Sequence, residues 1–144
     1  MPTSFDEIID LALVLINDNA LLNLYNQSDK KFIMQCDSWL ISAIPNFVRC
    51  NQSLEYDIST RQFTNTLTNM EISILADLWI LEWMKRQTQD STKINALLQS
   101  SGSFKSHSAA QNLKEKSSYL DGLREKVSQK MTDYQLQNID NISI

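Results

Sequence analysis

Apolar side chains recur at three- and four-residue steps in four stretches of the chain, a pattern typical of helices that bury one face. The first stretch predicts a helix over 5–16 that is apolar on nearly every side and therefore deeply buried. Ser4 and Glu7 lie at its start with the spacing of a capping box, in which two side chains satisfy free backbone amides.

The second stretch predicts a helix over 29–44, which follows a short helical segment over 21–25. Ser28 and Asp29 are residue types that cap the N-terminus of a helix. Pro45 marks the end of the helix, because proline has no amide hydrogen and its ring clashes with the preceding turn.

The third stretch has the strongest pattern and predicts a helix over 69–89, with Thr68 and Glu71 at capping-box spacing. A separate short helix is predicted over 92–99. The small residues of 100–108 then predict a loop.

The last stretch predicts a helix over 109–135, with Ser108 and Gln111 as a third capping box. Residues 136–144 have no pattern, and we expect a loose C-terminal tail there. The apolar residues of this helix repeat every seven positions, which is typical of a helix that packs along one seam: Leu113, Leu120, Val127 and Tyr134.

Residues 46–67 are mostly polar and give no helical pattern. Tyr56 and Ile58 alternate with polar residues, which is the pattern of a short edge strand or hairpin. An ordered loop that packs Phe63 against the helices is the preferred interpretation.

These elements define an all-α fold, a small bundle of about four main helices with a long C-terminal helix and a loose C-terminal tail. We expect one helical domain over 1–135 and a tail over 136–144. The composition agrees, because the 144 residues include only two glycines and two prolines. Turn-rich β-sandwiches and glycine-rich phosphate loops need more of both.

The net charge of −4 argues against a general nucleic-acid binder, because such proteins are normally basic. The charge is also uneven. Residues 1–72 hold four basic and nine acidic side chains, whereas residues 85–130 hold nine basic and four acidic ones. Either this is ordinary surface variation, or a basic face of one copy meets an acidic face of another in head-to-tail association.

Cys36 and Cys50 are the only cysteines, and we expect both thiols to be buried and reduced. The longest apolar run, 11–16, is far shorter than the roughly 20 residues that span a bilayer. Acidic residues near the start of the chain do not suit a signal peptide. We therefore expect a soluble chain.

The sequence offers little for catalysis. His107 is the only histidine and lies in a polar loop, where a loop or capping role is expected rather than that of a base. Glu71, Asp77 and Glu82 are the candidates for paired carboxylates, but Asp77 is expected to point away from the apolar face toward solvent. No phosphate-loop, dinucleotide or zinc-protease motif is present. We expect neither an enzyme nor a cofactor or metal site.

Trp39, Trp79 and Trp83 are either core residues or a platform on which bases of single-stranded nucleic acid stack. Their helical spacing beside leucine and isoleucine favours the core. Trp83 alternatively lies at the edge of the core, where it reaches a partner. The basic segment 85–130 is in the same way more consistent with a solvated face than with phosphate contacts.

The stretch from Leu67 to Tyr134 resembles the head–tail connector proteins of tailed bacteriophages, also called adaptor or neck proteins. The resemblance lies in LTNMEISILADLWILEWMKRQ and in ALLQSSGSFKSHSAAQNLKEKSSYLDGLREKV. An apolar helix that ends in a Glu-Trp pair is followed by a short helix, a Phe-Lys turn and a long final helix. The positions that match are Glu82, Trp83, Phe104, Lys105, Ala110, Asn112, Leu113 and Lys114.

The resemblance implies a structural virion protein. Such proteins form a ring, usually of twelve copies, that binds beneath the portal protein and extends the DNA channel toward the next neck or tail component. They are assembled in the bacterial cytoplasm, lie in the neck of the virion, and need no cofactor or membrane. The DNA passes through only as channel content, and an acidic wall suits this because it repels the duplex.

The loop after residue 100 and the C-terminal tail are the expected contact segments. Each displays apolar side chains that nothing nearby in the sequence buries, and such segments often become ordered on a partner. The candidate contact residues are Gly102, Phe104, Lys105, Ser106, Ile139, Ile142 and Ile144.

Two other functions remain open. One is a helical DNA-packaging module similar to a small terminase subunit, which would need a basic recognition helix. The other is an assembly chaperone that dimerises through the seam over 113–134.

Overall fold

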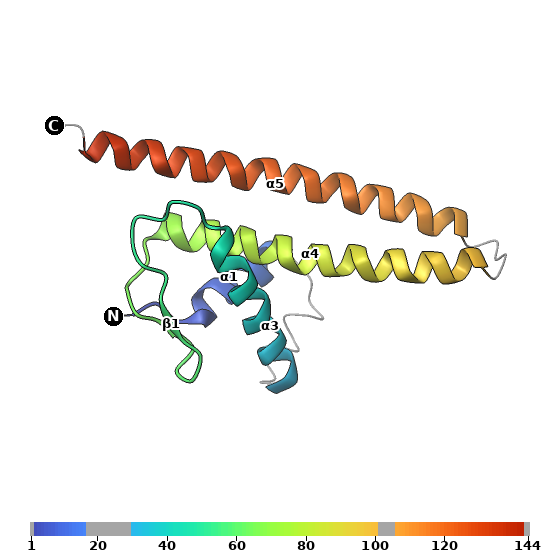
Figure 1. Ribbon diagram of the computed structural model, residues 1–144, viewed down its shortest axis with the longest axis horizontal. Coiled ribbons are helices and arrows are strands. Elements are labelled where there is room, and N and C mark those ends of the chain that lie inside the picture. The colour runs from blue at the N-terminus through green and yellow to red at the C-terminus, as the bar shows by residue number, and fades with distance from the viewer. Residues whose placement is uncertain (1, 17–29, 101–105, 143–144) are drawn as a thin grey trace.

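Two long antiparallel helices, α4 (Asn69–Ser100) and α5 (Ser106–Ile142), lie side by side along the length of the computed structural model (Figure 1). The structure describes residues 2–16, 30–100 and 106–142, and it describes side chains within 2–16, 30–86 and 118–137. The described elements are helices apart from two short strands, so the all-α fold class is confirmed. The predicted segment over 21–25 and the cap at Ser28 and Asp29 lie outside the described residues.

Helices α1 (Phe5–Ile16) and α3 (Lys30–Ala43) pack against the first half of α4 (Figure 1). The helix starts follow the predicted chemistry. Glu7 accepts a hydrogen bond from the backbone N–H of Ser4 at 2.9 Å. Beyond α1 and α3, the second half of α4 and the first half of α5 project together as a two-helix arm, which comprises residues 87–100 and 106–117 (Figure 1).

Helix α4 is central because every residue from Ile74 to Leu81 is buried. Its start is a complete capping box, in which Thr68 Oγ1 accepts the N–H of Glu71 at 3.2 Å and Glu71 Oε1 accepts the N–H of Thr68 at 2.8 Å. Trp79 is fully buried, donates its indole N–H to the carbonyl oxygen of Cys36 at 3.0 Å, and meets Trp39 edge-on. This places the core between α1, α3 and α4.

The helix boundaries correct the sequence-based prediction at three places. A break between 89 and 92 was wrong, because α4 is one helix of 32 residues that runs beside α5 to Ser100. The predicted loop over 100–108 and the cap at Ser108 were also wrong in part, because α5 already begins at Ser106. Elongation of an existing helix adds one hydrogen bond per residue, so a polar stretch without Gly or Pro continues it at little cost.

The expected loose tail is also corrected, because α5 continues to Ile142. The apolar seam ends at Tyr134, but no glycine or proline follows it to stop the helix. Pro45 ends the helix as predicted. Helix α3 ends at Ala43 and is followed by a single 3-10 turn, η1 (Ile44–Asn46).

Residues 46–67 contain the hairpin that was the less favoured interpretation. Strands β1 (Tyr56–Asp57) and β2 (Gln62–Phe63) pair antiparallel, with Tyr56 opposite Phe63. Phe63 is buried against the helices, as the loop interpretation required, and its ring lies edge-on to Phe5 with centroids 5.3 Å apart. The N-terminal segment pairs with the far side of β2 through a bridge between Ser4 and Gln62.

Replacing Trp79 with alanine tests the core. We expect the free energy of unfolding to fall by about 3–5 kcal/mol, because a fully buried aromatic ring leaves a cavity and its hydrogen bond is lost. Tyr119→Ala is the matched control, because that ring is 61% exposed and its loss should cost less than about 0.5 kcal/mol. Chemical denaturation measures both. Equal losses in the two variants would contradict this core.

Candidate functional site

The predicted contact residues divide between two distant places. Ser106 is the first residue of α5, whereas Ile139 and Ile142 lie in its last turns. Thirty-three residues of helix separate Ser106 from Ile139, which is about 50 Å at 1.5 Å per residue. The structure therefore does not bring these predicted contacts together. Gly102, Phe104, Lys105 and Ile144 lie outside the described residues.

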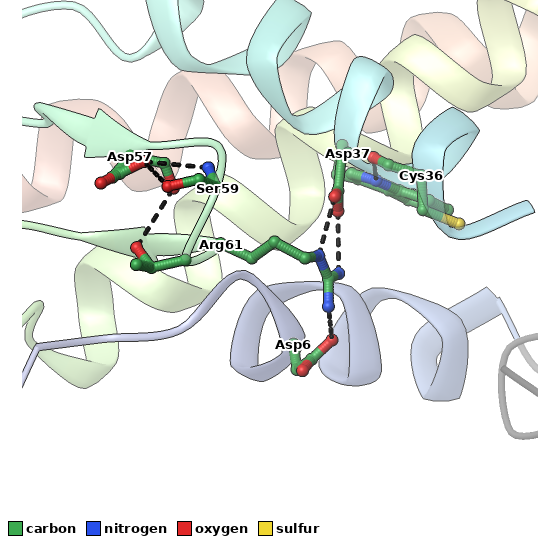
Figure 2. Close-up of polar contacts among 8 residues, drawn as sticks. Asp6, Cys36, Asp37, Asp57, Ser59 and Arg61 are labelled. Atoms are coloured by element: carbon green, nitrogen blue, oxygen red, sulfur yellow. Dashed lines mark hydrogen bonds and ion pairs between the residues drawn. The ribbon is translucent and has the colours of Figure 1, made fainter. Parts of the chain in front are cut away.

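The hairpin forms an exposed projection at the N-terminal end of α1. Its four-residue turn, 58–61, displays Ile58 with 59% of its surface exposed. Asp57 closes the turn by accepting hydrogen bonds from the hydroxyl of Ser59 at 2.6 Å and from its backbone N–H at 2.9 Å (Figure 2). The bond from the hydroxyl, and to a lesser extent the bond from the N–H, lowers the pKa of the Asp57 carboxyl. Asp57 is therefore charged at neutral pH.

Arg61 fixes this hairpin to two helices (Figure 2). Its guanidinium binds both carboxylate oxygens of Asp37 on α3, at 2.7 and 2.8 Å, and reaches Asp6 on α1 at 3.0 Å. The backbone of Arg61 has a φ of 55°, a conformation that a non-glycine residue adopts only when its surroundings hold it there. The hydrogen bonds to Asp37 raise the pKa of Arg61, so the clamp keeps its charge.

A buried carboxylate joins α4 to α5. Glu71 is only 2% exposed, and its side chain accepts hydrogen bonds from Tyr134 at 2.6 Å and from the amide of Gln52. The Tyr134 hydroxyl in turn accepts the N–H of Asn51 at 2.9 Å. Burial alone raises the pKa of Glu71, but the hydrogen bonds from Tyr134, Thr68 and Gln52 outweigh it, and the pKa lies below its ordinary value.

Asp77 corrects the expectation of a solvated carboxylate. It is 1% exposed, and it pairs with Lys130 of α5 at 2.6 Å. Lys130 also donates to the hydroxyl of Ser73 at 2.9 Å. The sequence of α4 alone predicts that the face carrying Asp77 is exposed to solvent. Asp77 is buried because α5 packs over that face. Glu82 is partly exposed and forms an ion pair with Lys85 at 3.2 Å. Asp77 and Glu82 therefore each pair with a different lysine and do not pair with each other.

A groove of about 250 Å³ opens where the C-terminal end of α1 meets α4 and α5. Its rim includes Leu15, which is 49% exposed, and Tyr119. The indole N–H of Trp83 in its wall is buried and has no acceptor among the residues that the structure describes. Most of the lining side chains are apolar, and Asp77 and Lys126 add two charged ones: Leu15, Ile16, Ile80, Trp83, Met84, Tyr119, Leu123, with Asp77 and Lys126.

The remaining sequence-based candidates have these positions. Trp79 is a core residue and Trp39 packs against it, so they do not form a stacking platform; Trp83 lies at the core edge. His107 lies in the first turn of α5. Cys36 and Cys50 are free thiols, and burial raises the pKa of Cys36 to about 12, while Cys50 is only partly buried.

The described residues contain no cluster of three or more side chains suited to hold a metal ion. No helix among them has the length and apolar character needed to span a membrane.

The sequence did not identify most of the residues that shape the hairpin and the groove. The alternation of Tyr56 and Ile58 was the one signal for the hairpin. Nothing in the sequence pointed to Arg61, Lys126 or Lys130, because their partners and neighbours lie far away along the chain.

Comparison of the chain with protein-family models, with curated proteins and with solved structures finds no match.

Removing the Arg61 clamp should destabilise the chain. We expect Arg61→Met to lower the free energy of unfolding by about 2 kcal/mol, because hydrogen bonds to a charged group are lost and Asp37 stays largely buried. Arg124→Met is the matched control: its pair with Asp121 is exposed, and such pairs contribute at most about 1 kcal/mol. Thermal unfolding measures both, and equal midpoints would contradict the clamp.

The lowered pKa of Glu71 predicts acid sensitivity. Stability from this carboxylate is complete above its unfolded-state pKa, near 4.5, and is lost as the pH falls through the lower folded-state pKa. Tyr134→Phe removes the hydrogen bond that Tyr134 donates to Glu71, so we expect the free energy of unfolding to fall by about 1.5–3 kcal/mol at pH 7 and by less in acid. Unfolding is measured at pH 7 and pH 3, with Tyr119→Phe as control. An unchanged pH dependence in Tyr134→Phe would refute the role of Glu71.

Proposed function

We propose that this chain is a structural subunit of a bacteriophage neck, a head–tail connector that forms a ring beneath the portal protein and extends the DNA channel. The observation that carries the proposal is the two-helix arm, residues 87–100 and 106–117, which projects from a body built by α1, α3 and the hairpin (Figure 1). A body with a projecting arm can contact a neighbour in a ring at two separate places.

The distribution of charge supports the proposal. The sequence over 87–117 holds four basic and two acidic residues, a balance of +2, which leaves −6 on the rest of the chain. Opposite charges at two places on one subunit favour head-to-tail contacts, and a head-to-tail contact closes into a ring when its rotation permits. An acidic body also repels packaged DNA, which suits a channel wall.

The resemblance over residues 67–134 supports the same function. It covers α4 and most of α5, the two helices that form the arm and its base. We propose the portal protein and the next neck or tail component as partners, and the neck of the virion as the location. A ring of twelve copies is the expected size.

The chaperone alternative is disfavoured by one observation. It requires dimerisation through the apolar seam of α5, but the described seam residues, Leu120, Val127 and Tyr134, are buried within the same chain. The terminase-like alternative needs a basic recognition helix. The described helices of the first half, α1 and α3, belong to the acidic part of the sequence.

The mass of the purified chain, alone and mixed with the portal protein of the same phage, tests the proposal. We expect a closed ring that co-sediments with the portal, whereas a dimer that does not bind portal would contradict the proposal. Deletion of 136–144 and Phe104→Ala are then compared with His107→Ala as the control. Loss of co-sedimentation in the first two variants alone would support the predicted contact segments, and full assembly of both would exclude those segments.

A further inference from the structure

The hairpin and the groove are complementary in charge and in apolar character. The hairpin presents the segment 55–58, in which the exposed Ile58 follows two acidic residues, Glu55 and Asp57. We call this segment the acidic tip. The groove is apolar and has Lys126 at its edge.

The acidic tip is held in place before any partner binds. Tyr56 packs edge-on against Phe5 with ring centroids 5.9 Å apart, and its neighbours Glu55 and Asp57 are exposed to solvent. The Arg61 clamp and the turn closed by Asp57 fix the loop behind Ile58 (Figure 2). A contact made by such a segment loses little conformational entropy on binding.

The groove has a charge to match. Asp77, its one acidic lining residue, is already neutralised by Lys130. Lys126 is exposed and makes no ion pair with any residue within the described ranges. The groove therefore combines an apolar wall with a net positive edge, which favours an apolar side chain flanked by carboxylates.

One copy cannot fill its own groove with its own tip. The tip lies against Phe5, at the first residue of α1, whereas Leu15 and Ile16 at the other end of α1 line the groove. The 12 residues of α1 span about 18 Å. Two complementary surfaces at opposite ends of one helix are the arrangement that links identical copies head to tail.

We propose that the acidic tip of one copy inserts Ile58 into the α1–α4–α5 groove of the next copy, with Glu55 beside Lys126. This inference rests on the proposed ring and names the contact between neighbouring subunits. Because tip and groove are different surfaces, the contact is heterologous, and each added copy presents a free tip and a free groove until the ring closes.

A charge exchange tests the contact in the full chain. Glu55→Lys and Lys126→Glu should each weaken self-association about tenfold or more, measured by sedimentation velocity over a range of concentrations with and without the portal protein. The chain that carries both substitutions should recover most of the association, because the exchanged charges meet again between neighbours. Ile58→Ser should weaken association by a similar factor, whereas Met34→Ser, at an apolar residue of α3 that is even more exposed, should not.

The outcomes separate this contact from the proposed function. If the parent forms a portal-binding ring that Glu55→Lys, Lys126→Glu and Ile58→Ser leave unchanged, the contact is refuted and the connector function stands. If the groove is instead filled by residues 17–29 of the same chain, Leu15→Lys will lower the unfolding midpoint without weakening association, which also refutes the contact. A parent that stays monomeric, alone and with the portal, overturns both proposals.

Discussion

The complete burial of Ile74–Leu81 in α4 is the constraint on which the rest of the structure depends. A helix buried on all sides needs neighbours on all sides, and α1, α3 and α5 supply them. It also needs a partner for any charge that it carries. Asp77 obtains one from Lys130, and this pair, the hydrogen bond between Tyr134 and Glu71 and the buried apolar seam of α5 together set the face of α5 that meets α4. The long overlap of α4 and α5, and hence the arm, follows from that alignment.

The sequence predicted the helices that begin with a chemical signal and bury one face. The helix over 5–16 and the start at Asn69 were correct because capping residues and periodicity agree there. The continuous α4 was missed because residues 87–93 are polar, and the partner helix that runs beside them is distant in sequence. The burial of Asp77 was missed for the same reason, since its partner lies 53 residues away.

The surfaces were harder to predict than the fold. The contact residues were expected to be exposed because no nearby part of the sequence buries their apolar side chains. Whether a side chain is exposed depends, however, on elements that meet only after folding. Ile58 is exposed and Phe63 is buried, although both occur in the same polar stretch. The difference arises because the hydrogen bonds from Arg61 to Asp37 and Asp6 hold the turn against α3 and α1. One side of the hairpin then faces the helices and the other faces solvent.

The most direct test of head-to-tail assembly is chemical cross-linking between a tip and a groove. One chain carries Ile58→Cys, a second carries Tyr119→Cys, and a short bis-maleimide is added. Burial raises the pKa of both native thiols, which keeps their reactivity low. We expect a covalent dimer only when the two chains are mixed, and a ladder ending at the ring size when one chain carries both cysteines. Equal cross-linking of each single variant with itself, or none in the mixture, would contradict the account.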